Sequence, residues 1–358
     1  GQRQKEDWTL DGVGNWVANP FQDQGASPVS EGRTHSDFNE IVARAIASAT
    51  ATLSHDRNGN TLDTGARVAA GQTFDGGGLR FAWDALNRLR EIHFNNNTPG
   101  DESDDILIAV MLYDCTNRRM RMVLTNNDIA SGATDYYFDG WQEIEERDGS
   151  DAILRQYVYG NYMDEVWTLD DRSGGATVAQ LNDGVGGQRK HYHCNTLYSI
   201  YALTDETNTI FEVYQFNAYG TPIAWQGSGA DTAFFTDDDV VSTTSCGAPV
   251  SAVGNARLYT GRHQIPVDLI GSGIHYYRNR YYHPDIGRFL GRDPLGYVAG
   301  VAYYLYTNGA PTTWTDEFGL STFCDSIEDV WVPVPIGGAV NVAKDFLRTT
   351  PGQILWCE

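Results

Sequence analysis

The chain has few basic residues, few methionines and no long apolar run. Its 25 Lys and Arg face 47 Asp and Glu, which gives a formal net charge of −22. A polyanion would be repelled by that charge rather than gain from counterion release, so we expect no nucleic-acid partner for this segment. No apolar run approaches the roughly 20 residues that cross a bilayer. We therefore expect no membrane span in this segment either.

Cysteine is also scarce, and the five cysteines show neither a CxxC pair nor a spacing typical of zinc sites. His191, His193 and Cys194 lie too close together for tetrahedral coordination without a fourth partner, so we interpret them as part of a polar strand. The stretch from Asp56 to Asn60 lacks the correctly placed glycine and the closing glutamate of a calcium loop, which favours a turn. The sequence predicts no cofactor and no metal site.

Glycine and aromatic residues are abundant instead, with 38 Gly, 20 Tyr, 14 Phe and 9 Trp. Such a composition favours strands and turns over helices, so the chain is expected to be all-β. The first residue is Gly1 rather than Met. We expect the chain to be the C-terminal part of a longer protein.

A short motif recurs along the chain. An apolar or aromatic residue, or His55, precedes an Asp that is followed by variable residues including Gly or Asn, and a new strand then begins. The copies are Leu10 to Asn15, His55 to Asn60, Trp83 to Arg88, Tyr113 to Arg118 and Phe138 to Trp141, with a degenerate copy at Phe216 to Gly220.

Each copy of this motif is suited to close a tight hairpin. Asp bonds backbone groups two residues on, and Gly or Asn accepts a positive φ. The flanking residues alternate as strands do, for example 79–83 before one turn and 89–94 after it. Because a lone hairpin is marginal in water, successive hairpins must pair with their neighbours, and the expected product is a long, wound sheet.

Irregular insertions are expected at about residues 17–50, 95–105, 171–190 and 226–256, where Gly, Ser, Asp and Asn accumulate. The stretch from Asp37 to Thr52 has Phe38, Ile41, Val42 and Ile46 at helix-like spacing. A short helix and a strand are both compatible with that pattern.

Residues 256–320 carry a dense set of motifs. This multi-part signature resembles the core of Rhs or YD-repeat proteins, which include the C components of insecticidal ABC toxin complexes and, more distantly, animal teneurins. Weaker similarity extends upstream to about residue 8. The motifs are Leu258 to Arg262, Gly273 to Tyr282, Pro284 to Gly296, Asn308 to Pro311 and Asp316 to Leu320.

The resemblance implies a fold and a division of the chain. In this family the YD-repeat hairpins wind into a spiral β-shell, and the core curls inward as a plug. The expected parts are a shell segment at 1–255, the core or plug at 256–320 and a short variable tail at 321–358. The implied partners are the N-terminal remainder of the same shell and either an enclosed C-terminal segment or a surface or secretion partner.

The resemblance also implies a function for the bacterial members, which are secreted or cell-surface polymorphic toxins. The core commonly cuts itself by aspartyl autoproteolysis just after a DPxGL motif. Asp293 and Asp316 match the paired Asp motifs, which places the cut between Leu320 and Ser321. Two adjacent carboxylates share a proton and can serve as acid and base, with Arg292, or alternatively Arg288, holding one of them.

Other interpretations of these residues remain open. Asp293 and Asp316 could be plain turn residues, and Glu317 stands where the family has a proline that would restrict the backbone. Arg278, Arg280 and Arg288 lie among aromatic residues, which indicates cation–π packing within the plug. The alternative function is an extracellular structural or adhesion scaffold with no catalytic activity.

Overall fold

The computed structural model describes residues 6–22, 31–46, 49–65, 78–95, 102–125, 132–172, 188–225, 234, 251, 254–265, 273–296, 300–320, 331–334 and 338–341. Within them the regular elements are strands, apart from short 3-10 turns such as η2 (Tyr259–Gly261) and η4 (Thr307–Gly309). The all-β prediction is confirmed. Among the described residues no helix is long and apolar enough to cross a membrane.

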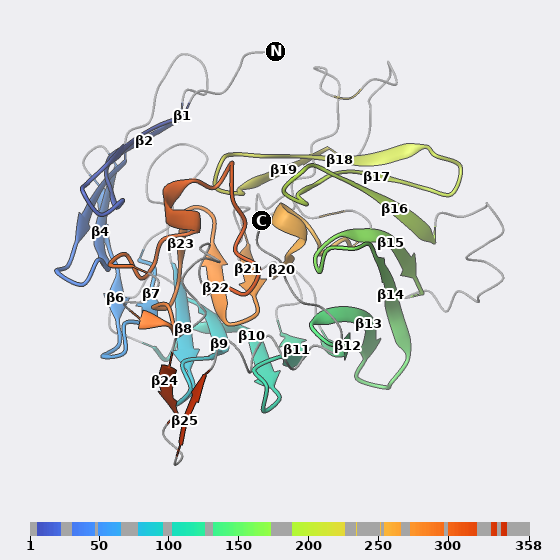
Figure 1. Ribbon diagram of the computed structural model, residues 1–358, viewed down its shortest axis with the longest axis horizontal. Helices are drawn as coiled ribbons and strands as arrows, with labels where there is room; N and C mark the ends of the chain where they lie inside the picture. Colours follow the sequence, from blue (N-terminus) through green and yellow to red (C-terminus); the bar gives the residue numbers. More distant parts are fainter. Residues whose placement is uncertain are drawn as a thin grey trace.

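Two antiparallel sheets hold the first nineteen strands in chain order, and within each sheet every strand pairs with its sequence neighbours. We call these strands the wall (Figure 1). The first sheet contains β1 (Glu6–Leu10), β2 (Trp16–Gln22), β3 (Glu31–His35), β4 (Ile41–Ile46) and β5 (Ala49–Thr52). The second contains β6 (Ser54–His55), β7 (Thr61–Asp63), β8 (Leu79–Trp83), β9 (Leu89–Phe94), β10 (Ile106–Tyr113), β11 (Arg119–Leu124), β12 (Gly132–Asp139), β13 (Gln142–Asp148), β14 (Ile153–Tyr159), β15 (Val166–Asp171), β16 (Arg189–Cys194), β17 (Ile200–Thr204), β18 (Ile210–Phe216) and β19 (Pro222–Trp225).

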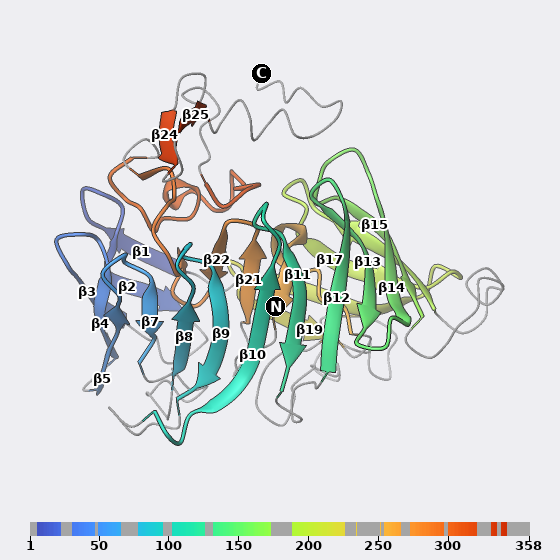
Figure 2. The same cartoon turned by 90° about the horizontal axis from the view of Figure 1, so that it is seen from below.

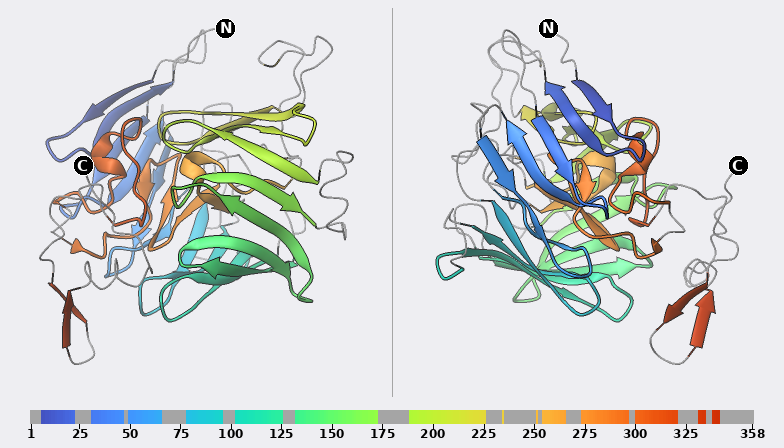
Figure 3. Two further views of the ribbon diagram at one scale, coloured as in Figure 1. Left: turned by 45° about the vertical axis from the view of Figure 1, so that its right-hand side comes forward. Right: turned by 90° about the vertical axis from the view of Figure 1, so that its left-hand side faces the viewer.

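The later residues form a small four-stranded sheet and a separate strand pair. The small sheet is β20 (His263–Ile265), β21 (Ile274–Tyr277), β22 (Arg280–His283) and β23 (Arg288–Phe289), and the pair is β24 (Trp331–Val334) with β25 (Gly338–Asn341). We call the described residues of 256–320 the plug. Figure 2 shows the wall strands side by side, and Figures 1 and 3 show the plug strands inside the curve of the wall.

The repeated Asp closes the predicted hairpins at Asp11, Asp56, Asp84 and Asp114 in the predicted way. At the predicted copy Phe138 to Trp141, by contrast, Asp139 is paired with Gln142 within the β12–β13 ladder and the chain turns at Gly140, which has a φ of 58°. Between β8 and β9, the Asp84 Oδ1 atom accepts hydrogen bonds from the backbone N–H groups of Leu86 (2.8 Å) and Arg88 (3.0 Å), while Asn87 takes a φ of 59°. Equivalent turns begin at Asp148, Asn195 and Asp205, which the sequence analysis had not included among the copies. These turns lack the aromatic residue before the Asp or Asn, so the motif definition was too narrow.

The expected insertion at 17–50 is wrong, and the helical alternative for its second half is wrong as well. β2 to β5 occupy this stretch, and the turn at Ser36 joins β3 to β4. Ser36 Oγ accepts from the N–H of Phe38 (3.2 Å) and of Glu40 (3.3 Å), so a serine takes the role of the repeat Asp. The other expected insertions fall largely outside the described residues.

The plug is packed with side chains that wall strands cover. All residues of β21 and β22 are buried, and five plug aromatics, Tyr259, Tyr277, Tyr282, Phe289 and Tyr306, form one cluster. A second cluster joins apolar side chains of β8 to β12 to those of β20, β21 and β22. The plug and the wall therefore share one hydrophobic core.

Plug and wall also touch through their backbones at Gly261. This residue has a φ of +70°, and a Cβ there would lie 2.2 Å from the backbone oxygen of Asp164, between β14 and β15. Gly296 has a similar φ of +61°, but its Cβ would meet nothing within 4 Å. The two glycines have equal backbone strain and different surroundings.

We expect Gly261→Ala to destabilise the protein more than Gly296→Ala does. The left-handed backbone costs about 1–2 kcal/mol at either position, and the clash with Asp164 adds about 1–3 kcal/mol at Gly261 alone. Chemical denaturation of the two variants measures the difference. Equal losses of unfolding free energy would contradict the close wall contact.

Candidate active site

Asp293 and Asp316 lie on either side of one guanidinium group. The Arg280 Nη2 atom is 3.0 Å from Asp293 Oδ2 and 3.2 Å from Asp316 Oδ2. Arg280 begins β22, Asp293 follows β23 and Asp316 follows η4. All three side chains are buried. The plug fold therefore brings together the two carboxylates that the sequence analysis had singled out.

Each Asp uses its second oxygen for the local backbone. Asp293 Oδ1 accepts from the N–H of Leu295 (2.8 Å), and Asp316 Oδ1 accepts from the N–H of Leu320 (3.0 Å). These bonds are the turn contacts of the plain structural interpretation. They leave both Oδ2 atoms directed at Arg280.

The surroundings of Asp293 favour its protonated form. Burial raises the pKa of Asp293 to about 6, and the Asp316 carboxylate acts in the same direction, whereas Arg280 and the Leu295 N–H oppose the rise. A carboxyl group with this pKa holds its proton into the mildly acidic range and can then donate it. Asp293 is thus the candidate acid of the pair.

The backbone from Glu317 to Leu320 is held along its length by the turn between β21 and β22. Arg278 Nη1 donates to the carbonyl oxygen of Glu317, Asn279 Nδ2 donates to that of Phe318 at 3.0 Å, and Arg280 Nε donates to that of Gly319. Three successive side chains therefore hold three successive carbonyls. The backbone at Glu317 is fixed by a hydrogen bond where a proline ring would restrict it in the family. Ser321 lies outside the described residues.

Arg292 and Arg288 lie away from the carboxylate pair and contact the wall. Arg292 Nη2 is 2.6 Å from Glu40 Oε1, and Arg288 donates to the backbone oxygen of Asn39 at 2.7 Å. Arg280 occupies the place expected for them. The predicted aromatic packing is confirmed for Arg278 and Arg280, since Arg280 lies 3.6 Å above the Phe289 ring and Arg278 lies 5.6 Å above that of Phe318. For Arg288 the contacts are the polar ones to the wall.

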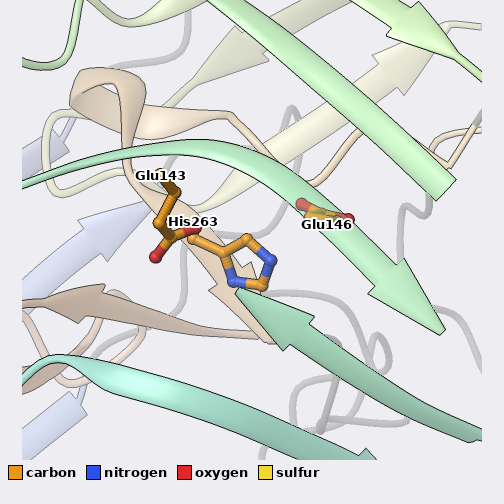
Figure 4. A group of neighbouring side chains, drawn as sticks. All are labelled: Glu143, Glu146 and His263. Carbon is orange, nitrogen blue, oxygen red and sulfur yellow. The ribbon is translucent and has the colours of Figure 1, made fainter. Parts of the chain in front are cut away.

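A second group of ionisable side chains lies between the wall and β20. Glu143 and Glu146 of β13 and His263 place one potential ligand atom each within 4.8 Å of one another (Figure 4). Sequence reasoning missed this group because its members come from distant segments. Distance alone would allow a metal ion there.

The charges around this group do not suit a cation. Arg257 Nη2 lies 2.5 Å from Glu143, Arg155 Nη1 lies 2.9 Å from Glu146, and Arg119 Nη2 lies 2.9 Å from His263 Nδ1. Burial, followed by Arg119, lowers the pKa of His263 well below its usual range, so the ring is neutral. Guanidinium groups already take the place of a metal, and we interpret the group as a buried ion network.

The chain resembles bacterial toxins over most of its length. No family model matches it. The tRNA3(Ser)-specific nuclease WapA of Bacillus spizizenii is 23% identical over 319 residues, which are 87% of this chain and 11% of that protein. The probable deoxyribonuclease RhsA of Dickeya dadantii is 35% identical over 81 residues, 23% of this chain and 6% of that protein.

A solved structure shows the same fold. The crystal structure of TcdB2-TccC3-TEV matches with a TM-score of 0.50 and 15% identity, over 88% of this chain and 15% of that one. The chain is an Rhs/YD-repeat shell segment. It is similar to the shell regions of Rhs-type polymorphic toxins, and it spans about a tenth of the length of the WapA relative that it matches.

The buried ion network around Glu143 joins the wall to the plug through Arg257, and its contribution to stability can be measured. We expect Glu143→Gln to lower the free energy of unfolding by about 3–5 kcal/mol, because it leaves buried Arg257 without its counter-charge. Asp151→Asn removes the exposed Asp151–Arg147 pair and should change stability little. Denaturant titration compares the two. A small effect at Glu143 would mean that the network is dispensable.

Proposed function

We propose that this segment forms wall and plug of a secreted or cell-surface toxin shell, and that the plug cuts the chain between Leu320 and Ser321. The shell would enclose or present the segment that follows Leu320, with the N-terminal remainder of the same shell as its partner. Residues 1–255, 256–320 and 321–358 would then be wall, plug and variable tail. The observation that carries the cleavage is the Asp293–Arg280–Asp316 arrangement beside a backbone held from Glu317 to Gly319.

The proposed reaction is hydrolysis of one peptide bond. Asp316 in its carboxylate form takes a proton from water, whose oxygen adds to the carbonyl carbon of Leu320. The C–N bond then breaks, and Asp293 gives its proton to the departing nitrogen of Ser321. The products are a carboxylate on Leu320 and a free amino group on Ser321, and no cofactor is needed.

The position of Asp316 supports this assignment of roles. Its Oδ1 atom accepts from the N–H of Leu320, which is the residue that carries the carbonyl to be attacked. The same carboxylate is therefore tied to the backbone on which it would act. Such pre-positioning of a reacting group removes part of the entropic barrier.

We expect the full-length protein to yield a fragment that begins at Ser321. Asp293→Asn and Asp316→Asn should each abolish the cut, because either change removes one member of the acid–base pair. Intact-mass spectrometry and N-terminal sequencing of the purified protein measure the outcome. An uncut wild-type chain would favour the alternative of a non-catalytic extracellular scaffold.

The arginine assignment has its own control. Arg280→Gln should slow cleavage strongly, since it removes the group between the two carboxylates, whereas Arg292→Gln should act mainly through the Glu40 contact and leave the folded protein able to cut. Both rates are measured on folded protein isolated by size exclusion. The reverse order of effects would restore the role first expected for Arg292.

The cleavage rate should depend on pH through Asp293. Because the pKa of this acid is raised to about 6, the proton it must donate is present below pH 6 and is lost as pH rises through that value. Above it, the rate should fall about tenfold per pH unit. A time course of cleavage from pH 5 to pH 8.5 tests this, and a rate that rises with pH in that range would exclude Asp293 as the acid.

A further inference from the structure

The turn between β14 and β15 differs from the repeated Asp turns of the wall. At the repeated turns the first carboxylate accepts from backbone N–H groups of its own turn, as Asp84 and Asp205 do. Here that task falls to Glu165, whose Oε2 atom accepts from the N–H of Asn161 (2.9 Å) and of Tyr162 (3.3 Å). The neighbouring carboxylate of Asp164 is left for another partner.

Asp164 instead holds two arginines of the plug. Its Oδ1 atom lies 2.7 Å from Arg278 Nη2, and its Oδ2 atom lies 3.0 Å from Arg262 Nη2. The exposed fractions of the three residues are 4% for Asp164, 7% for Arg278 and 2% for Arg262. The close approach at Gly261 fixes the backbone of Asp164 against the plug at the same point. A single wall carboxylate thus forms direct ion pairs with two buried guanidinium groups, and the half-buried Glu317 carboxyl interacts with both at longer range.

Each of these arginines also holds the backbone of the candidate active site. Arg262 Nη2 donates to the carbonyl oxygen of Asp316 at 3.0 Å, and Arg278 Nη1 donates to that of Glu317. The wall residue Asp164 is therefore connected to the backbone of Asp316 through a single side chain, that of Arg262. Without Asp164, the two buried cations would lose the carboxylate that they contact and keep only the longer-range interaction with the Glu317 carboxyl. Both would then have to move toward water or other acceptors.

We propose that Asp164 is a positioning residue for self-cleavage, and that through it the cut depends on the wall having closed around the plug. This inference rests on the proposed function. Asp164 touches neither of the reacting carboxylates, and it acts by orienting Arg262 and Arg278, which fix the backbone of Asp316 and Glu317. In a chain whose β14–β15 hairpin had not yet packed on the plug, both aspartates would be present, but Arg262 and Arg278 would not be oriented to hold the backbone of Asp316 and Glu317.

The wall offers a matched control in Glu31. This buried carboxylate also holds two arginines, with Arg33 Nε at 2.6 Å and Arg44 Nη2 at 2.7 Å. Arg33 likewise donates to a plug carbonyl, that of Ile286, at 2.6 Å. Glu31→Gln therefore removes the carboxylate that orients a wall arginine toward the plug, at a place away from the carboxylate pair.

The experiment follows single-turnover cleavage of the full-length protein in wild type, Asp164→Asn, Glu31→Gln and Asp293→Asn, each scored on the folded fraction. Displacement of a reacting group by about 1 Å costs roughly 100-fold in rate, so we expect a loss of that order in Asp164→Asn and less than about threefold in Glu31→Gln. Asp164→Asn should also change the pH dependence of cleavage, because a displaced Asp316 would contribute differently to the raised pKa of Asp293. A defect in folding alone would not produce that change.

The outcomes separate the two proposals. Cleavage in Asp164→Asn at the wild-type rate, or equal slowing in Asp164→Asn and Glu31→Gln with an unchanged pH dependence, would overturn the positioning role and leave self-cleavage intact. Cleavage that persists in Asp293→Asn, or an uncut wild type, would overturn the proposed function and the positioning role with it.

Discussion

Buried arginines that reach from one part of the chain to another are the interaction on which this structure depends. Arg33, Arg119 and Arg262 are buried, and each pairs with groups on the far side of the wall–plug boundary. A buried guanidinium is tolerable only when acceptors surround it, so wall and plug must meet in one register or leave charges unpaired. Aromatic stacking could be satisfied in several registers, but this set of hydrogen bonds and ion pairs selects one. The Arg119 guanidinium combines both kinds of contact, since it lies between the rings of Tyr136 and Tyr276 at 4.5 and 4.6 Å.

Because the hairpin turns satisfy their own backbone groups, the side chains of the wall strands are available as acceptors for the buried arginines. At most of the turns that the structure describes, an Asp, Asn or Ser side chain satisfies the backbone N–H groups locally, which leaves the strand side chains available to face the plug. Within β13, Glu143 and Glu146 lie among the buried residues while Ile144 is 38% exposed. A repeat that builds its own turns without outside help can therefore tolerate charged residues on its inner face, provided that the plug brings the matching charges.

The features of this structure that could be predicted from the sequence are those that depend on residues close together in the chain. The Asp turns, the strand alternation and the presence of Asp293 and Asp316 in paired motifs are all readable within a few residues. The turn at Ser36 was missed because the motif was defined by an Asp, whereas a serine hydroxyl can accept the same backbone hydrogen bonds. The spacing of the apolar residues after Ser36 also resembles that of a helix. Arg280 was missed as the partner of the carboxylates because the two residues that follow it, Tyr281 and Tyr282, are aromatic. Nothing local distinguishes a stacking arginine from one that also bridges two acids. The roles of Asp164 and Glu143 could not be predicted from local sequence at all, because their partners lie in distant segments that only the closed fold brings near.

In this geometry the role of turn residue and the role of acid–base residue are compatible for the two aspartates. A carboxylate has two oxygens, and Asp293 and Asp316 each use one for a backbone N–H and direct the other at Arg280. The backbone bond fixes the side-chain rotamer, which in turn fixes where the second oxygen lies. The turn contact is thus the means by which a flexible side chain acquires a defined direction. The same division of labour explains how Glu317 can stand in place of a proline: a proline ring would restrict the backbone from within, whereas here Arg278 and Asn279 hold it from outside. A site held from outside depends on the elements that hold it, and for Arg278 that element is the wall carboxylate of Asp164.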